Sequence, residues 1–243
     1  KVHKNFDMCK NCSNFARYLY KLIQNMKKLT LLLLSVFAMT AVAQVTTIPA
    51  IIQKGYTGEV TIIFNPNEGN KGMVGASNCY AHTGLITSAS SNDGDWKNVV
   101  ENWRANTSKT QLTKDGNNWK LVIPNIYDYY KCPETTEIKK LAFVFHDGPS
   151  GSKEGKTAEG TDIFVELADK GLAVSINDLP EIPLLNTKVT LVGNATSSAN
   201  LTLKINGETV KTATGTELTY DYTFSKQGNY SIEFSATAGS ETK

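Results

Sequence analysis

The clearest alternation of apolar and polar positions lies at residues 140–148, which read Lys-Leu-Ala-Phe-Val-Phe-His-Asp-Gly. In a strand, the large apolar side chains from Leu141 to Phe145 fall on one face and a smaller, mixed set falls on the other. Residues 118–124 repeat the pattern, with Trp119 at the head of a second in-phase apolar set. We therefore predict two central strands of a β-sandwich, paired with each other in one sheet.

The rest of the chain after residue 43 consists of similar short alternating runs that are separated by turn residues. Further strands are expected at 45–52, 59–64, 79–87 and 162–167. Helical spacing occurs only from Trp96 to Trp103, where apolar residues follow an i, i+3, i+4, i+7 pattern that predicts a short helical turn or an irregular segment. The fold class is therefore all-β, and we predict a first β-sandwich domain over residues 44–170.

Residues 171–243 predict a second β-sandwich of immunoglobulin-like type. Asn206-Gly207 is a strong two-residue hairpin signal between two of its strands. Such a sandwich ordinarily needs another strand after residues 238–239 to cover its edge, so we expect this domain to be incomplete. The expected strands are 173–176, 188–192, 201–205, 218–224 and 230–236.

Residues 26–43 have the features of a secretory signal peptide. A short basic start, Met-Lys-Lys, precedes an apolar run at 29–38, and Ala-Val-Ala at 41–43 offers small residues for cleavage. The apolar run is shorter than the roughly 20 residues of a membrane-spanning helix. We expect a secreted or periplasmic protein without a membrane span, preceded at residues 1–25 by an unstructured leader.

Removal of these segments changes the charge of the protein. The whole chain has a formal net charge of +2, but residues 1–43 contain seven basic residues and one acidic residue. The mature part is therefore acidic, with a net charge of about −4. This charge argues against a nucleic-acid partner, and we expect a monomer.

The four cysteines divide between the leader and the mature chain. Cys9 and Cys12 form a CxxC, a pattern that can bind metal or take part in redox chemistry, although a single pair in a discarded leader is weak support for either. Cys79 and Cys132 belong to the first domain. In an exported protein they are candidates for a disulfide, and two buried free thiols are the ordinary alternative.

Candidates for catalysis are few. The mature chain has two histidines, His82 and His146, and lacks the common hydrolase, nucleotide-binding and metalloprotease motifs. Asp93-Gly94-Asp95 could supply calcium ligands, but a polar turn is the simpler interpretation. We therefore predict no catalytic residues, no metal site and no cofactor, and we expect that the chain is not itself an enzyme.

The aromatic residues indicate a different activity. A sugar ring has an apolar face of C–H groups, so proteins bind it with a flat aromatic ring and a few polar neighbours. Tyr80 and His82 share one face of the predicted strand 79–87, and Trp96 follows beyond a polar loop. The alternative is that Trp96 packs in the core and Tyr80 only lies on a sheet.

A set of short motifs resembles, in order, the starch-binding β-sandwich modules attached to bacterial amylases. The motifs are Val60–Phe64, Cys79–His82, Gly94–Trp96, Trp119–Pro124 and Phe143–Gly148. Residues 26–243 as a whole resemble the amino-terminal part of secreted α-amylase-family glycoside hydrolases of Bacteroidota. One departure is that His146 replaces an Asn that is frequent in that family, with Pro149-Ser150-Gly151 following.

The resemblance implies that Tyr80, His82 and Trp96 bind an α-glucan such as starch. The chain would then be the non-catalytic front of a starch-degrading enzyme, in which a binding domain and a spacer precede a catalytic barrel beyond Lys243. Such a domain raises the local concentration of polymer near a linked active site. The alternative is a structural or adhesive β-sandwich protein without a sugar site.

Overall fold

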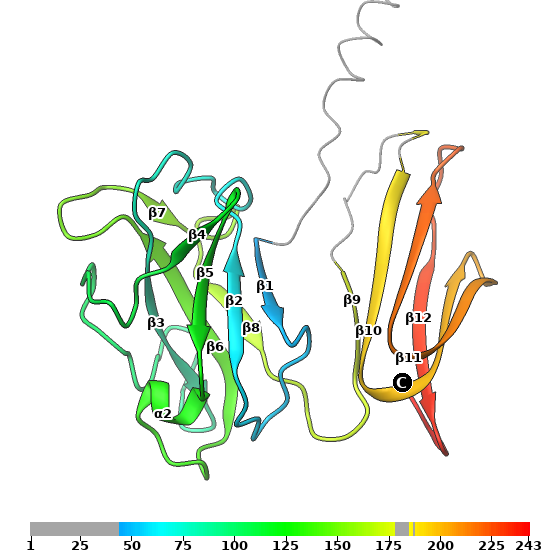
Figure 1. Cartoon of the computed structure of the whole chain (residues 1–243), viewed down its shortest axis with the longest axis horizontal. Helices are drawn as coiled ribbons and strands as arrows, with labels where there is room; N and C mark the ends of the chain where they lie inside the picture. The colour runs from blue at the N-terminus through cyan, green and yellow to red at the C-terminus, as the bar shows by residue number, and fades with distance from the viewer. Residues whose placement is uncertain (1–43, 178–184, 187) are drawn as a thin grey trace, which may run out of the picture.

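The structure is a computed structural model that describes residues 44–177, 185–186 and 188–243 (Figure 1). The described chain is nearly all β, as predicted, with a single helical turn. The predicted leader, signal peptide and CxxC motif lie outside the described residues. Among the helices of the described part, none is long and apolar enough to cross a membrane.

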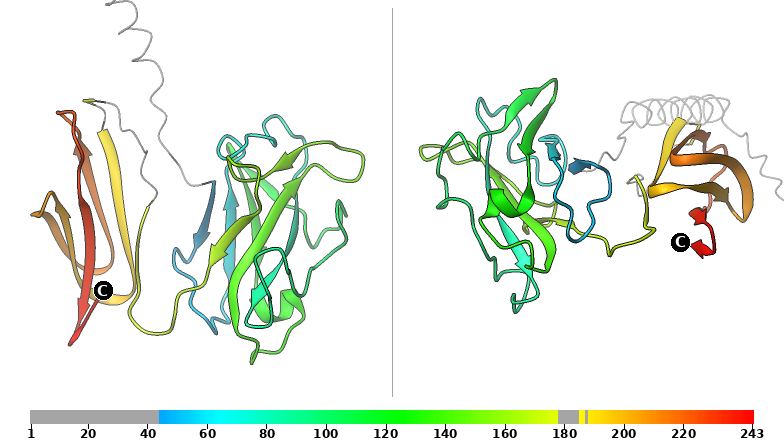
Figure 2. Two further views of the ribbon diagram at one scale, coloured as in Figure 1. Left: turned by 180° about the vertical axis from the view of Figure 1, so that it is seen from behind. Right: turned by 60° about the horizontal axis from the view of Figure 1, so that its bottom comes forward.

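Residues 44–170 form two antiparallel sheets that face each other (Figures 1 and 2). One sheet has the order β1-β2-β5-β4, and the other has the order β3-β6-β7 with β8 also paired to β6. The strands of the first sheet are β1 (Val45–Ile48), β2 (Val60–Phe64), β4 (Thr113–Asp115) and β5 (Asn118–Ile123). Those of the second are β3 (Tyr80–Thr87), β6 (Ile138–His146), β7 (Glu154–Gly155) and β8 (Ile163–Glu166).

The predicted pairing of the two central strands is wrong. Strand β5 pairs with β2, and β6 pairs with β3, so the two apolar runs lie in opposite sheets. Their large side chains meet across the interior, where Phe64 stacks on Phe145 with ring centroids 4.0 Å apart. The alternating pattern fits both arrangements, the two strands paired in one sheet or facing each other from opposite sheets. In either case the same face of each strand is buried.

The interior between these sheets is continuous and fully apolar at its centre. Phe64, Phe143 and Phe145 are at most 1% exposed, and Trp119 is buried with them. Trp119 is therefore a core residue, as its position in the alternating run predicts.

Strand β3 is an edge strand whose free side is covered by a long loop. The loop exchanges backbone hydrogen bonds with β3 at Leu85 and Lys97, 2.8 and 2.7 Å long. Further along, the amide of Val100 donates to the carbonyl of Thr83, and the amide of Ala81 donates to that of Thr110. The loop thus protects the edge, and it lays residues 96–103 along the outer side of the second sheet as an irregular segment rather than a helix.

The helical turn α2 (Ile126–Tyr130) closes one end of the two sheets. The side chain of Asn125 accepts hydrogen bonds from the amides of Tyr127 and Asp128, which is the usual cap of a helix start. The turn ends at Lys131, whose backbone is left-handed with φ of 53°. Tyr130 is buried, and its hydroxyl lies 2.6 Å from the hydroxyl of Thr83 on β3.

The predicted disulfide between Cys79 and Cys132 is absent from the structure. Both are buried free cysteines in the apolar core between the sheets, Cys79 just before β3 and Cys132 just after α2. Burial raises the pKa of the Cys79 thiol well above its usual range, and burial also raises that of Cys132. In the structure the two residues pack as small apolar side chains, which corresponds to the alternative of two buried free thiols.

The described residues of 171–243 form one five-stranded antiparallel sheet (Figure 1). Its strands are β9 (Val174–Ile176), β10 (Lys188–Ile205), β11 (Glu208–Thr223), β12 (Ile232–Ala238) and β13 (Glu241–Thr242). The two strands predicted at 188–192 and 201–205 are one continuous strand, β10. The predicted hairpin turn at Asn206-Gly207 joins β10 to β11, and both residues have positive φ, as a type I′ turn requires.

The sheet bends on itself, as Figure 2 shows for β10 and β11. The pairing of these strands is irregular between Asn194 and Ala199, which separates β10 into a half that pairs with β9 and a half that pairs with β12. The bend brings the Phe234 ring of β12 against Gly193, where an added Cβ would approach the ring to 2.4 Å. A second apolar core forms inside the bend, around Leu191, Leu201 and Leu203.

Candidate functional site

Five rings gather on the outer face of the second sheet. Tyr80 and His82 point outward from β3, and His146 points outward from the end of β6, directly opposite Tyr80 in the register. Trp96 and Trp103 come from the covering loop. We call these five residues the aromatic cluster.

The rings of the aromatic cluster form a connected series. The Tyr80 ring is stacked on that of His146, with centroids 5.8 Å apart, and Trp103 lies 5.5 Å from His146 on the other side. The Trp103 ring also meets His82 edge-on at 5.1 Å and 87°. His82 in turn stacks with Trp96 at 5.5 Å and 24°. The two tryptophans therefore present their faces at a steep angle to each other, with His82 between them.

Three of these rings line an open hollow of about 480 Å³. Trp103 is 44% exposed, whereas Trp96 and His82 are half-buried. Charged side chains stand at the rim, so the hollow combines apolar faces with hydrogen-bonding groups. The residues that line it are His82, Gly94, Asp95, Trp96, Val99, Trp103, Val144, Lys156 and Asp162.

Gly84 lets the loop lie close to the sheet beneath Trp96. A Cβ added at this position would meet the carbonyl oxygen of Lys97 and a methyl of Val99 at 3.1 Å, and the Trp96 ring at 3.3 Å. Trp96 is further fixed by its indole N–H, which donates to the carbonyl oxygen of Asp93 at 3.0 Å. The position of this ring is thus set by the local backbone as well as by stacking on His82.

Both histidines are held neutral. Burial lowers the pKa of His82, partly offset by the negative charge of Asp162, and its Nδ1 is buried without a hydrogen-bond partner. Burial, with Arg104 and His82 nearby, lowers the pKa of His146 to about 4. The Nδ1 of His146 accepts a hydrogen bond from the amide of Gly148 at 3.1 Å, so this imidazole carries its proton on Nε2.

The acidic turn beside the hollow is engaged by lysines. Asp95 lies 2.7 Å from the Nζ of Lys97, and Asp93 lies 3.2 Å from that of Lys140. The hydrogen bond from Lys97, with others from Ser91, lowers the pKa of Asp95. Among the described residues, no three His, Cys, Asp or Glu side chains come together to hold a metal ion. Asp93-Gly94-Asp95 is thus a turn whose two carboxylates are paired with lysines.

The structure brings together part of the site predicted from sequence. His82 and Trp96 are in stacking contact at the hollow, whereas Tyr80 lies one ring away, on His146. The sequence interpretation did not assign Trp103 or His146 to the site. The helical spacing that Trp103 shares with Trp96 did not reveal its place in the site, because the segment between them is irregular and not a helix. His146 stands one strand across from Tyr80, a relation that appears only once β3 and β6 are paired.

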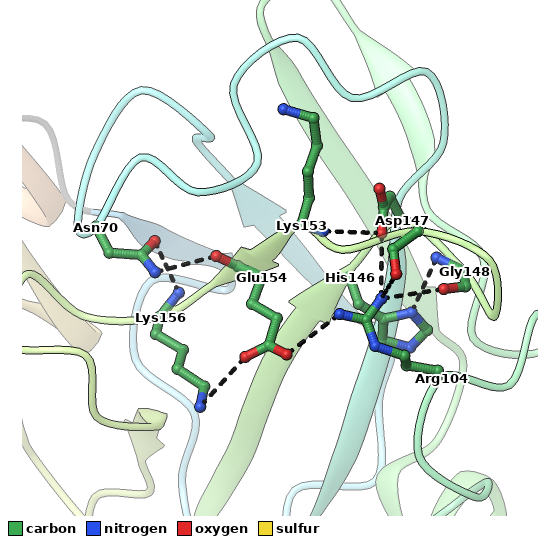
Figure 3. Close-up of polar contacts among 9 residues, drawn as sticks. Asn70, Arg104, His146, Asp147, Gly148, Lys153, Glu154 and Lys156 are labelled. Carbon is green, nitrogen blue, oxygen red and sulfur yellow. Dashed lines mark hydrogen bonds and ion pairs between the residues drawn. The ribbon is translucent and has the colours of Figure 1, made fainter.

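Arg104 is a further residue that the sequence interpretation missed. It follows Trp103 and is the only arginine between residues 44 and 243. Its guanidinium lies 5.5 Å from the centre of the Trp103 ring and reaches the loop after β6 (Figure 3). The sequence carried one sign that this position is special, namely that it holds the only arginine of residues 44–243.

The chain matches no protein-family model, and a comparison with curated proteins finds no significant similarity. The resemblance to starch-binding modules therefore rests on the sequence motifs alone.

Proposed function

We propose that the aromatic cluster binds a carbohydrate, and that the ligand is an α-glucan such as starch. The observation that carries the proposal is the hollow lined by Trp96, Trp103 and His82, in which exposed aromatic faces stand beside charged groups. Stacking on the apolar face of a sugar ring uses the indole faces, and the sugar hydroxyls need polar neighbours such as Lys156 and Asp162.

The steep angle between the two tryptophan rings favours a curved ligand. His82 is within 24° of parallel to Trp96 but 87° from Trp103, so no flat surface can cover both indole faces at once. A helical α-glucan turns from one sugar unit to the next and can meet both rings, whereas the flat face of crystalline cellulose can meet one. This geometry supports an α-linked glucan, in agreement with the resemblance.

The wider arrangement is also part of the proposal. Residues 44–170 would be the binding domain and residues 171–243 an immunoglobulin-like spacer, after removal of a signal peptide at 26–43. The two separate apolar cores, one within residues 52–167 and one within 172–236, support two domains. The exported protein would not hydrolyse starch, but would raise its concentration at a linked catalytic domain.

One observation favours the alternative, a structural or adhesive protein. Trp96 is half-buried, and its N–H is already used by Asp93, so part of this ring serves packing. Trp103, however, is exposed together with Val99 at the same hollow, so the exposed apolar groups there form a patch and not one isolated side chain. Binding therefore remains the better account of the hollow.

Affinity electrophoresis of residues 44–243 in amylopectin gels tests the proposal. We expect the wild type to be retarded, and Trp103→Ala and Trp96→Ala to be folded but retarded much less. Val122→Ala is the matched control, because Val122 is exposed on β5 in the other sheet. Trp119→Ala removes a core ring and should mainly destabilise the protein, by about 3–5 kcal/mol. Equal mobility of the wild type with and without amylopectin would refute the proposal.

A further inference from the structure

The segment that carries Trp103 is a loop fixed at its two ends to β3. At one end the amide of Val100 donates to the carbonyl oxygen of Thr83 at 3.0 Å, and at the other the amide of Ala81 donates to that of Thr110 at 2.8 Å. Trp103 lies between these anchors, away from the strand. Its ring nevertheless has a defined place, against His82 and His146.

The middle of this loop is held by Arg104. One guanidinium nitrogen of Arg104 donates to the carbonyl oxygens of Gly151 and Gly148 at 2.7 and 3.1 Å and to a carboxylate oxygen of Asp147 at 3.3 Å. The other terminal nitrogen donates to Glu154 at 3.2 Å (Figure 3). A planar guanidinium can serve several acceptors at fixed angles, which the ammonium group of a lysine cannot do in the same way.

These contacts are sheltered. The side chains of Arg104 and Asp147 are each 18% exposed, so their attraction is screened less than that of a surface ion pair. The partners are themselves fixed, because the backbone amide of Lys153 donates to Asp147, and Lys156 lies 3.4 Å from Glu154 (Figure 3). The loop after β6 thus offers Arg104 a pre-formed set of acceptors.

The backbone of Arg104 is also unusual. Its φ is 62°, in the left-handed region that residues other than glycine adopt only when surrounding contacts hold them there. The same guanidinium lies 5.5 Å from the centre of the Trp103 ring. One residue therefore joins the exposed indole, the strained turn and the loop after β6.

We propose that Arg104 is the positioning residue of the binding site: it fixes the Trp103 ring at the angle at which the ring can stack on a sugar. The inference rests on the proposed function for its ligand, but the positioning of Trp103 can be measured without one. Arg104 acts on the sugar only through Trp103. The charged groups at the hollow are Asp95, Lys156 and Asp162, and Arg104 is not among them.

The test uses residues 44–243 with Arg104→Gln, Arg104→Lys and a control, Lys114→Gln. The control removes a cation that lies 5.5 Å from another indole, that of buried Trp119 on β5. Retardation in amylopectin measures binding. Acrylamide quenching measures Trp103 directly when all four proteins also carry Trp96→Phe, because the chain has three tryptophans and Trp119 is buried.

We expect Arg104→Gln to weaken binding by roughly tenfold, the loss expected when a stacking ring is no longer held in place. Quenching of Trp103 should rise in the same variant. Arg104→Lys should restore neither property fully, and Lys114→Gln should leave both unchanged. Unaltered quenching in Arg104→Gln would overturn the inference. A loss of binding in Lys114→Gln as large as the loss in Arg104→Gln would overturn it too.

Two further outcomes remain decisive. If Arg104→Gln does not fold, Asp147→Asn and Glu154→Gln each remove the negative charge of one of its carboxylate partners. Higher Trp103 quenching in these folded variants is then the result that supports the inference. If wild-type protein is not retarded by amylopectin, the proposed function fails, and the quenching result alone decides whether Arg104 positions Trp103.

Discussion

The imidazole of His146 is kept neutral by its surroundings. It is 1% exposed, it accepts a hydrogen bond from the amide of Gly148, and Arg104 adds a positive charge nearby. Burial and the charge of Arg104 disfavour a second proton on the ring and lower its pKa to about 4, against the opposing charges of Asp147 and Glu154. His146 also lies between Tyr80 and Trp103, so its protonation would disturb the centre of the aromatic cluster.

This pKa predicts a loss of stability in acid. The unfolded histidine has a pKa near 6.5, so between that pH and about pH 4 the unfolded chain binds a proton that the folded protein does not. The stabilisation is complete above pH 6.5 and is lost as the pH falls. The free energy of unfolding, measured in urea at pH 7 and at pH 4.5, should fall between these pH values by about 2 kcal/mol more in the wild type than in His146→Asn. The Asn oxygen can still accept from Gly148, and equal losses in the two proteins would contradict the assignment.

The cysteines give a second prediction at the scale of residues. Burial raises the pKa of the Cys79 thiol, so little reactive thiolate exists at neutral pH. Thiol titration of residues 44–243, unfolded without reductant, should find two free thiols per chain. Folded protein should react slowly, and reductant should leave the melting temperature unchanged. A lower melting temperature after reduction would show that the bridge suggested by the sequence does form.

Among the elements, β3 and its covering loop determine the site. The strand supplies Tyr80 and His82 on its outer face, and its hydrogen bonds to the loop place Trp96 above Gly84. The inner face of the same strand buries Ala81 and Leu85 in the core. Packing on one side of β3 therefore fixes the geometry of the hollow on the other.

Gly84→Ala tests this coupling. The added methyl would lie 3.1 Å from both the Lys97 carbonyl oxygen and Val99, so the loop must move outward. We expect a loss of about 1–3 kcal/mol in the free energy of unfolding, as in other overpacked sites, and greater acrylamide quenching of Trp96. Removing one of the obstacles with Val99→Ala in the same protein should recover part of the loss. No change in either property would mean that the loop does not rest on the sheet as described.

Strand positions were largely predictable from sequence, and strand partners were not. The runs at 60–64 and 119–123 alternate because one face of each is buried, whereas 141–145 is buried on both faces and alternates in side-chain size. Both signals are local. Which strand pairs with which depends on contacts distant in sequence, and the predicted pairing of β5 with β6 failed for that reason. Strand β10 was divided in two because its middle, from Gly193 to Ala199, is small and polar, although the structure continues the strand through this stretch with irregular pairing.

The candidate site was likewise predictable only in part. His82 and Trp96 could be paired from sequence because a strand and a short polar turn separate them. Trp103 and Arg104 could not be placed, since their position depends on a left-handed backbone and on acceptors more than 40 residues away. A loop conformation of this kind leaves no periodic signal in the sequence.

At the scale of the whole molecule, the two apolar cores are separate. One holds residues from Ile52 to Leu167, and the other holds residues from Leu172 to Ala236. We expect residues 44–170 to fold alone and to be retarded in amylopectin as strongly as residues 44–243, because the aromatic cluster lies wholly within them. Loss of retardation by the shorter, folded protein would show that residues 171–243 contribute to binding.

The central claim, that the hollow between Trp96 and Trp103 binds an α-glucan, is tested most directly by calorimetric titration of residues 44–243 with maltoheptaose. The account predicts saturable binding to one site, lost in Trp103→Ala and absent with cellohexaose, whose straight chain cannot follow the angle between the rings. Absence of binding heat with maltoheptaose, or equal affinity in folded Trp103→Ala protein, would contradict it.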